Sequence, residues 1–118
     1  MLKIEQPRSG DETRLWRTTG EGVFWNSGDP LMSQYYASIN RNKRSCTIKL
    51  KSGKGVKIVR QMIRESDVVV ENFLPGKMDE LGLGLEVMKE VNPKIIMASV
   101  SGYGPHGAGG QANHWGWL

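Results

Sequence analysis

The residues best suited to bind an anion lie in one basic stretch of the chain, residues 41–60. This stretch holds eight of the sixteen Lys and Arg residues and no Asp or Glu. Lys51 and Lys54 flank Ser52-Gly53, a possible helix start, and helix N-termini bind phosphate groups through free backbone N–H groups. The stretch therefore predicts contact with a phosphorylated ligand, although a helix start with solvated lysines has the same sequence.

A second candidate site is the phrase Asn72-Phe73-Leu-Pro75-Gly76, which follows the apolar run Val68-Val-Val70. An Asn side chain offers a donor and an acceptor, a Phe side chain offers a flat apolar face, and Pro-Gly favours a turn. This combination can hold an adenine ring or a pantetheine arm at the end of a strand. The alternative is a structural turn with Phe73 in the core.

Other reactive residues lack the neighbours that a catalytic or metal site needs. Gly102-x-Gly104-x-x-Gly107 follows a predicted strand, but no helical pattern and no acidic partner of a nicotinamide site come after it. The histidines have no partner at metal-ligand spacing, so no metal is expected. The single cysteine excludes an internal disulfide and is expected to be structural, and the charged residues of the first loop are expected to form a surface ion pair. These residues are His106, His114, Cys46, Asp11, Glu12 and Arg14.

The periodicity of the apolar residues predicts the elements that position these candidates. Ser52 is expected to cap a helix that extends to about residue 66, and Pro93 follows the end of a later helix. Residues 12–30 show no steady period and predict a long irregular loop. The predicted strands are residues 1–5, 45–50, 68–70 and 95–100, and the other predicted helices are residues 31–39, 76–80 and 85–91.

Strands that alternate with helices at short spacing predict an α/β fold with a parallel sheet and right-handed crossovers. The apolar runs 68–70 and 95–100 are typical of strands buried on both faces. Ligands of such sheets bind beyond the carboxyl ends of the strands, which places residues 71–74 and 101–104 at the expected site. At 118 residues and 38% apolar composition, the chain fits one small domain with one core.

Bulk charge and hydropathy narrow the range of partners. The net charge of +4 favours anions, whether nucleic acid, acidic headgroups or a phosphorylated cofactor. No apolar run approaches the ~20 residues of a membrane span, and residues 1–5 lack the apolar core of a secretory signal. A soluble protein without a membrane partner is therefore expected.

Short phrases in a fixed order extend over most of the chain. They are Lys3-Ile-Glu-Gln-Pro7, Gly10-Asp-Glu-Thr-Arg14, Asn40-Arg-Asn-Lys-Arg-Ser45, Asp67-Val-Val-Val-Glu-Asn-Phe73, Pro75-Gly76, Leu81-Gly-Leu-Gly84, Asn92-Pro93 and Ser101-Gly-Tyr-Gly104. Together they resemble the family III (CaiB/BaiF-type) coenzyme A transferases, which include alpha-methylacyl-CoA racemase. Asn40-Arg-Asn-Lys-Arg44 and Leu74-Pro-Gly-Lys-Met78 are most similar to the succinyl-CoA:glutarate CoA-transferase branch.

The resemblance implies a partial Rossmann-like, CoA-binding domain at residues 1–107 and a divergent tail at residues 108–118 that is expected to be disordered. Asn72 and Phe73 match positions that contact CoA. Ile48, Leu50 and Lys51 match the stretch that lines the adenosine and its phosphates. Coenzyme A is then a substrate or acyl carrier, and no metal is implied.

The implied activity moves CoA from an acyl-CoA such as succinyl-CoA to a carboxylic acid, for example a dicarboxylic acid such as glutarate. In the family, an aspartate well beyond the Gly-Tyr-Gly phrase attacks the thioester. This chain is therefore expected to be a fragment, truncated at both ends, that lacks a catalytic residue and is inactive alone. The full-length family forms interlocked homodimers, and the glutarate branch implies a mitochondrial location, other branches a cytoplasmic one.

Three alternatives remain open at the level of the sequence. One is a chain without activity in which Trp115 and Trp117 are exposed because part of the core is missing, so that the chain is unstable or needs a partner. A racemase-like enzyme needs a catalytic His and Asp after the Gly-rich loop, and His114 has no Asp after it. A small nucleic-acid-binding module would explain the basic stretch, but no aromatic residues interleave it, so no nucleic acid is expected. Within the transferase reading, Gln6 and Glu80 replace two basic positions of formyl-CoA transferases. Phosphate contacts are then expected to be weaker or to move to other residues, namely Arg8, Lys43 or Lys77.

Overall fold

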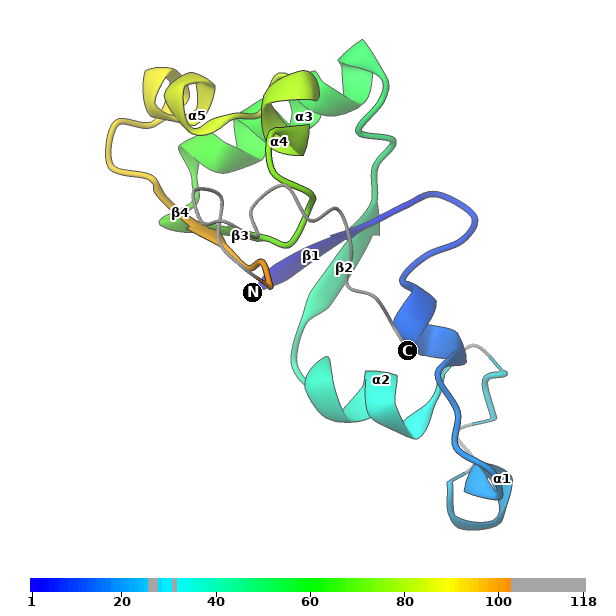
Figure 1. Ribbon diagram of the computed structural model, residues 1–118. Helices are drawn as coiled ribbons and strands as arrows, with labels where there is room; N and C mark the ends of the chain where they lie inside the picture. Colours follow the sequence, from blue (N-terminus) through cyan, green and yellow to red (C-terminus); the bar gives the residue numbers. More distant parts are fainter. Residues whose placement is uncertain (26–27, 31, 103–118) are drawn as a thin grey trace. The chain divides into compact units, whose positions relative to one another are not determined.

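The computed structural model of the protein describes residues 1–25, 28–30 and 32–102 (Figure 1). The fold is α/β, as predicted, with helices between parallel strands. The chain divides into two compact units, residues 1–49 and 50–118. No helix among the described residues is long and apolar enough to span a membrane.

The first unit is built on two parallel strands, β1 (Leu2–Glu5) and β2 (Arg44–Thr47). Leu2 pairs with Arg44 and Glu5 with Thr47 along the register. Between the strands lie the 3₁₀ helix η1 (Glu12–Leu15) and the helices α1 (Glu21–Phe24) and α2 (Gln34–Ile39). The predicted strand at residues 1–5 is therefore confirmed, whereas residues 12–30 contain two short helices in place of a wholly irregular loop.

Short polar side chains start the helices of the first unit. The Asp11 carboxylate accepts a hydrogen bond from the Thr13 N–H, and the Ser33 hydroxyl accepts one from the Tyr36 N–H. Both contacts satisfy backbone donors that the first turn leaves without an intrahelical partner. The sequence shows no helical spacing of apolar residues at η1, because only a single turn forms there.

The second unit contains α3 (Gly53–Arg64), β3 (Val68–Glu71), α4 (Lys77–Glu80), α5 (Leu85–Val91) and β4 (Ile96–Ser99). The strands β3 and β4 are parallel and pair from Val68–Ile96 to Glu71–Ser99. All three helices lie on one side of this pair (Figure 1). Each element falls within a few residues of its predicted range, and Ser52 caps α3 as predicted.

An apolar core holds the second unit together. Its buried side chains come from the inward face of α3, from both shorter helices and from the turns that adjoin them: Val59, Ile63, Met78, Leu83, Met88 and Ile95. Asn92 ties the end of α3 to this core, because its side-chain amide donates to the carbonyls of Ile63 (3.0 Å) and Ser66 (2.8 Å).

The prediction that β3 and β4 are buried on both faces was wrong. Val69 and Met97, which pair across the strands, are half-buried, but Val68, Val70 and Ile96 are exposed. Alternate residues of a strand point to opposite faces, so the helices of the second unit cover one face and leave the other open within the described residues.

Candidate functional site

The residues expected to contact CoA fall in both units. Ile48 belongs to the first unit, where it is buried and its N–H donates to the Glu5 carbonyl at 3.0 Å. This bond continues the β1–β2 ladder beyond the last paired residue. Leu50, Lys51, Asn72 and Phe73 belong to the second unit.

The carboxyl ends of β3 and β4 lie side by side, as predicted for a parallel pair. The Val100 N–H donates to the Glu71 carbonyl at 2.8 Å, directly where both strands finish. Asn72 and Phe73 extend beyond this bond and are exposed, and the Phe73 N–H donates to the Glu71 carboxylate at 2.7 Å. The alternative that placed Phe73 in the core is therefore wrong, and its ring is open to a ligand.

The N-terminus of α3 lies at this same end of the second unit. Only Glu65–Asp67 separate α3 from β3, so the chain reverses between them, and the start of α3 and the end of β3 are both remote from this connection. The Ser52 hydroxyl accepts from the Gly55 N–H at 3.0 Å. Lys51 and Lys54 are exposed, and no carboxylate among the described residues forms an ion pair with either.

These residues form what we call the carboxyl-end surface, defined as Leu50, Lys51, Lys54, Asn72 and Phe73. It combines two lysines beside a helix N-terminus, an exposed amide and an exposed aromatic ring. Such a surface can attract a phosphate and pack against a flat or apolar group. Lys77, an alternative phosphate ligand, instead forms an ion pair with Glu80 (2.5 Å).

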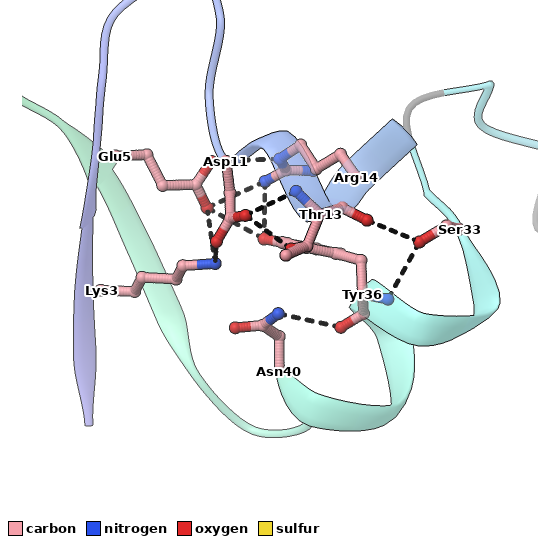
Figure 2. Close-up of polar contacts among 8 residues, drawn as sticks. All are labelled: Lys3, Glu5, Asp11, Thr13, Arg14, Ser33, Tyr36 and Asn40. Carbon is pink, nitrogen blue, oxygen red and sulfur yellow. Dashed lines mark hydrogen bonds and ion pairs between the residues drawn. The ribbon is translucent and has the colours of Figure 1, made fainter. Parts of the chain in front are cut away.

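A cluster of polar side chains occupies the first unit (Figure 2). We call it the polar cluster. Glu5 lies at its centre: Arg14 donates to both carboxylate oxygens at 3.0 Å, and the Tyr36 hydroxyl donates to one of them at 2.9 Å. The Arg14 guanidinium also lies over the Tyr36 ring, 4.1 Å from its centroid. The residues of the cluster are Lys3, Glu5, Asp11, Thr13, Arg14, Ser33, Tyr36 and Asn40.

The protonation of the polar cluster follows from these bonds. Burial alone would raise the pKa of Glu5, but the hydrogen bonds from Arg14 and Tyr36, with the charges of Arg14 and Lys3, hold that pKa below its ordinary value. Burial likewise opposes ionisation of Asp11, whose pKa is nevertheless lowered by Lys3 and Thr13. Desolvation and the neighbouring Glu5 carboxylate raise the pKa of Tyr36.

The polar cluster stabilises the fold of the first unit and is not suited to act as a catalytic base. The Glu5 carboxylate is ionised and already accepts three hydrogen bonds, so it has little capacity left to take a proton from a substrate. The prediction of a surface ion pair in the first loop was wrong, because Arg14 pairs with Glu5 of β1 and Asp11 with Lys3. The alternation of Lys3 and Glu5 along β1 was the sequence signal for one polar strand face.

Several sequence candidates lie outside the described residues, namely His106, His114, Trp115, Trp117 and the end of the Gly-rich loop from residue 103 onwards. The predicted tail at residues 108–118 lies there too. In the part of the chain that the structure describes, no three His, Cys, Asp or Glu side chains gather into a possible metal site. Cys46 is half-buried with a free thiol.

Comparisons with known proteins identify relatives of the whole described region. The sequence model of CoA-transferase family III matches residues 1–117. An acyl-CoA transferase of Fusarium pseudograminearum is 49% identical over 107 residues. The succinyl-CoA:glutarate CoA-transferase of Homo sapiens is 42% identical over 110 residues. A crystal structure of a CaiB/BaiF family protein from Brucella suis superposes with a TM-score of 0.79 at 36% identity.

Coverage is high for this chain and low for its relatives. The Fusarium and human matches include 91% of this chain but only 24% and 23% of the respective relative. The Brucella structure covers 92% of this chain, which corresponds to 28% of the crystallised one. The chain thus spans about a quarter of the length of the relatives that it matches.

Proposed function

The chain belongs to CoA-transferase family III, and on this premise we propose that it carries a CoA-binding surface of an acyl-CoA:carboxylate CoA-transferase. The observation that carries the proposal is the carboxyl-end surface of the second unit. There, cationic and aromatic side chains that are far apart in the sequence lie at one end of a parallel strand pair.

Each part of the carboxyl-end surface suits one part of CoA. Lys51, Lys54 and the start of α3 attract the phosphates of the nucleotide, since no described carboxylate neutralises these lysines. Asn72 and Phe73 bind the adenine or the pantetheine arm by hydrogen bonding and apolar contact. Leu50 adds an apolar side chain to this surface, and Ile48, which is buried in the first unit, is a further proposed CoA-binding residue.

The proposed reaction is transfer of CoA from an acyl-CoA to a carboxylic acid. The human relative, a succinyl-CoA:glutarate CoA-transferase, supports a succinyl-CoA donor and a dicarboxylic acceptor such as glutarate. The nucleophilic aspartate of the family lies well beyond the Gly-Tyr-Gly phrase, and we assign it no counterpart within residues 1–118. The chain alone is therefore proposed to bind CoA without turnover. We propose that the whole protein is a homodimeric, mitochondrial enzyme with the length that is typical of the family.

Isothermal titration of the 118-residue chain with CoA, and with CoA that lacks its 3′-phosphate, tests the binding proposal. We expect CoA to bind and the analogue to bind more weakly. Lys51→Ala should weaken CoA binding by roughly fivefold, which corresponds to about 1 kcal/mol. Phe73→Ala should weaken it further and to a similar extent for both ligands, because the ring contacts no phosphate.

Lys94→Ala is the matched control, since Lys94 is exposed in the turn before β4, at the opposite end of the strand pair. Its affinity for CoA should equal that of the unchanged chain. A folded sample that binds no CoA, or an equal loss from Lys94→Ala and Lys51→Ala, would contradict the site. CoA transfer from succinyl-CoA to glutarate by the chain alone would contradict only the proposed inactivity.

A further inference from the structure

The segment that joins β3 to α4 is held at both of its ends. At its start, the Glu71 carbonyl accepts from the Val100 N–H at 2.8 Å, which fixes the last residue of β3 against the chain that leaves β4. At its end, a type II turn over residues 74–77 is closed by a backbone hydrogen bond of 2.9 Å and has Gly76 at the positive φ of 80° that this turn requires. Residues 72–73, the proposed ligand residues, lie between these two fixed points.

The side chain of Glu71 adds a further contact inside this segment. Its carboxylate Oε2 accepts a hydrogen bond from the Phe73 N–H at 2.7 Å. A backbone N–H bond of this length to a charged acceptor is among the stronger hydrogen bonds in proteins. The bond closes a small turn directly after β3, and the Phe73 side chain at that turn is 41% exposed. The half-buried Glu71 thus fixes the backbone at the residue whose ring is open to a ligand.

A carboxylate at this position needs an explanation, because the carboxyl-end surface is proposed to bind an anionic ligand. A negative charge repels phosphate groups, so the charge of Glu71 by itself disfavours CoA binding. The hydrogen bond to the Phe73 N–H is the feature of Glu71 that can favour binding instead. The two effects have opposite signs, and substitutions that remove one of them without the other can therefore separate them.

We propose that Glu71 is a positioning residue of the carboxyl-end surface. Its carboxylate holds the backbone of Asn72 and Phe73 in the conformation in which the amide and the ring are exposed to the ligand. A surface that already has its binding conformation loses less conformational entropy when the ligand binds. The inference rests on the proposed CoA-binding function and extends it to a side chain that acts through its neighbours and does not itself contact CoA.

Isothermal titration of Glu71 variants with CoA separates positioning from charge. Glu71→Ala removes the hydrogen-bond acceptor, whereas Glu71→Gln removes the charge and keeps a side-chain oxygen that can accept from the Phe73 N–H. We expect Glu71→Ala to weaken CoA binding by roughly threefold to tenfold, and Glu71→Gln to bind CoA within about twofold of the unchanged chain. Tighter binding by both variants would show that repulsion is the only effect of Glu71. That result, or equal weakening by both variants, would overturn the proposal.

Asp67→Ala is the matched control, because Asp67 is exposed and precedes β3 at the opposite end of the same strand. Its backbone carbonyl accepts from the Ile96 N–H at 3.0 Å, as the carbonyl of Glu71 accepts from Val100. Asp67→Ala removes the same charge and should leave the affinity for CoA unchanged. A loss of affinity equal to that of Glu71→Ala would contradict a role specific to Glu71.

A double-mutant cycle shows whether Glu71 acts through Phe73. Glu71→Ala should cost less affinity in the Phe73→Ala background than in the unchanged chain, because part of the contact that Glu71 positions is already absent. Additive losses would mean that Glu71 acts independently and would overturn the proposal. A folded chain that binds no CoA would overturn the proposed function together with this inference, whereas a chain that binds CoA equally well before and after Glu71→Ala would overturn this inference alone.

Discussion

The two units of this protein are stabilised by different kinds of contact. Among the described residues, all three buried polar side chains, Glu5, Glu21 and Ser33, belong to the first unit. The buried apolar side chains of the second unit come from its helices and turns and include Leu83 and Met88. Hydrogen bonds and ion pairs between specific side chains therefore stabilise the first unit, whereas apolar packing stabilises the second.

This difference has a physical consequence for substitutions. A buried polar group is costly when its partner is removed, because the remaining group is left unsatisfied. A buried apolar group is costly in proportion to the cavity that its removal leaves. The first unit should therefore respond to changes of charge and pH, and the second to changes of side-chain volume.

The largest expected effect is Met88→Ala, because Met88 is fully buried in the second unit. We expect a loss of about 2–5 kcal/mol in the free energy of unfolding. Leu85→Ala, at a 36% exposed position of the same helix, should cost about 1 kcal/mol or less. Hydrogen exchange resolved by residue measures the loss in each unit. An equal loss at both positions would contradict a volume-filled core.

Glu5→Gln should destabilise the first unit by about 1–3 kcal/mol, because Arg14 and Tyr36 then lose the charged acceptor they share. Glu86→Gln is the control, since the Glu86 side chain is 87% exposed and its contact with Lys89 is loose. That substitution should have no measurable effect on unfolding. If Glu5→Gln lowered the free energy of unfolding as little as the control, the polar cluster would not be what stabilises the first unit.

Acid should weaken the first unit before the second. The pKa values of Glu5 and Asp11 are lowered in the folded chain from 4.5 and 3.8 respectively. Their contribution to stability is therefore complete above these unfolded values and is lost as the pH falls through the lower, folded values. Hydrogen exchange can be measured from roughly pH 6 down to pH 3, a range that includes the unfolded-state pKa values of both carboxyls. Protection should be lost first in residues 1–49. Simultaneous loss in both units would contradict the expected order.

The smallest expected difference separates two helix caps of the same type. The Ser33 hydroxyl is buried, accepts from the Tyr36 N–H and donates to the Thr13 carbonyl at 2.8 Å. The Ser52 hydroxyl caps α3. Ser52→Ala should cost about 1 kcal/mol, and Ser33→Ala about 1 kcal/mol more, because the partly buried Thr13 carbonyl also loses its donor. Urea denaturation of the two variants measures both costs, and a larger loss for Ser52→Ala would reverse the comparison between the units.

Much of the second unit could be predicted from the sequence because its signals are local. The apolar spacing of α3, its Ser52 cap and the Asn92-Pro93 end of α5 depend only on residues within a few positions of each other. The expected ligand end was also predictable, since parallel strands share a carboxyl end. The sequence could not decide whether Phe73 is exposed at this end or packed in the core, because burial depends on the neighbours of the turn.

The sequence by itself determined the family, the order of strands and helices, and the residue types that suit CoA. Only the tertiary structure decided that Glu5 meets Tyr36, 31 residues away, and that Arg14 leaves the surface to join them. It also decided that Val68 and Val70 face outward despite their apolar character. The reason is the same in each case. Pairing and burial depend on which segments are in contact in the folded chain, and the local periodicity of the sequence does not specify those long-range contacts.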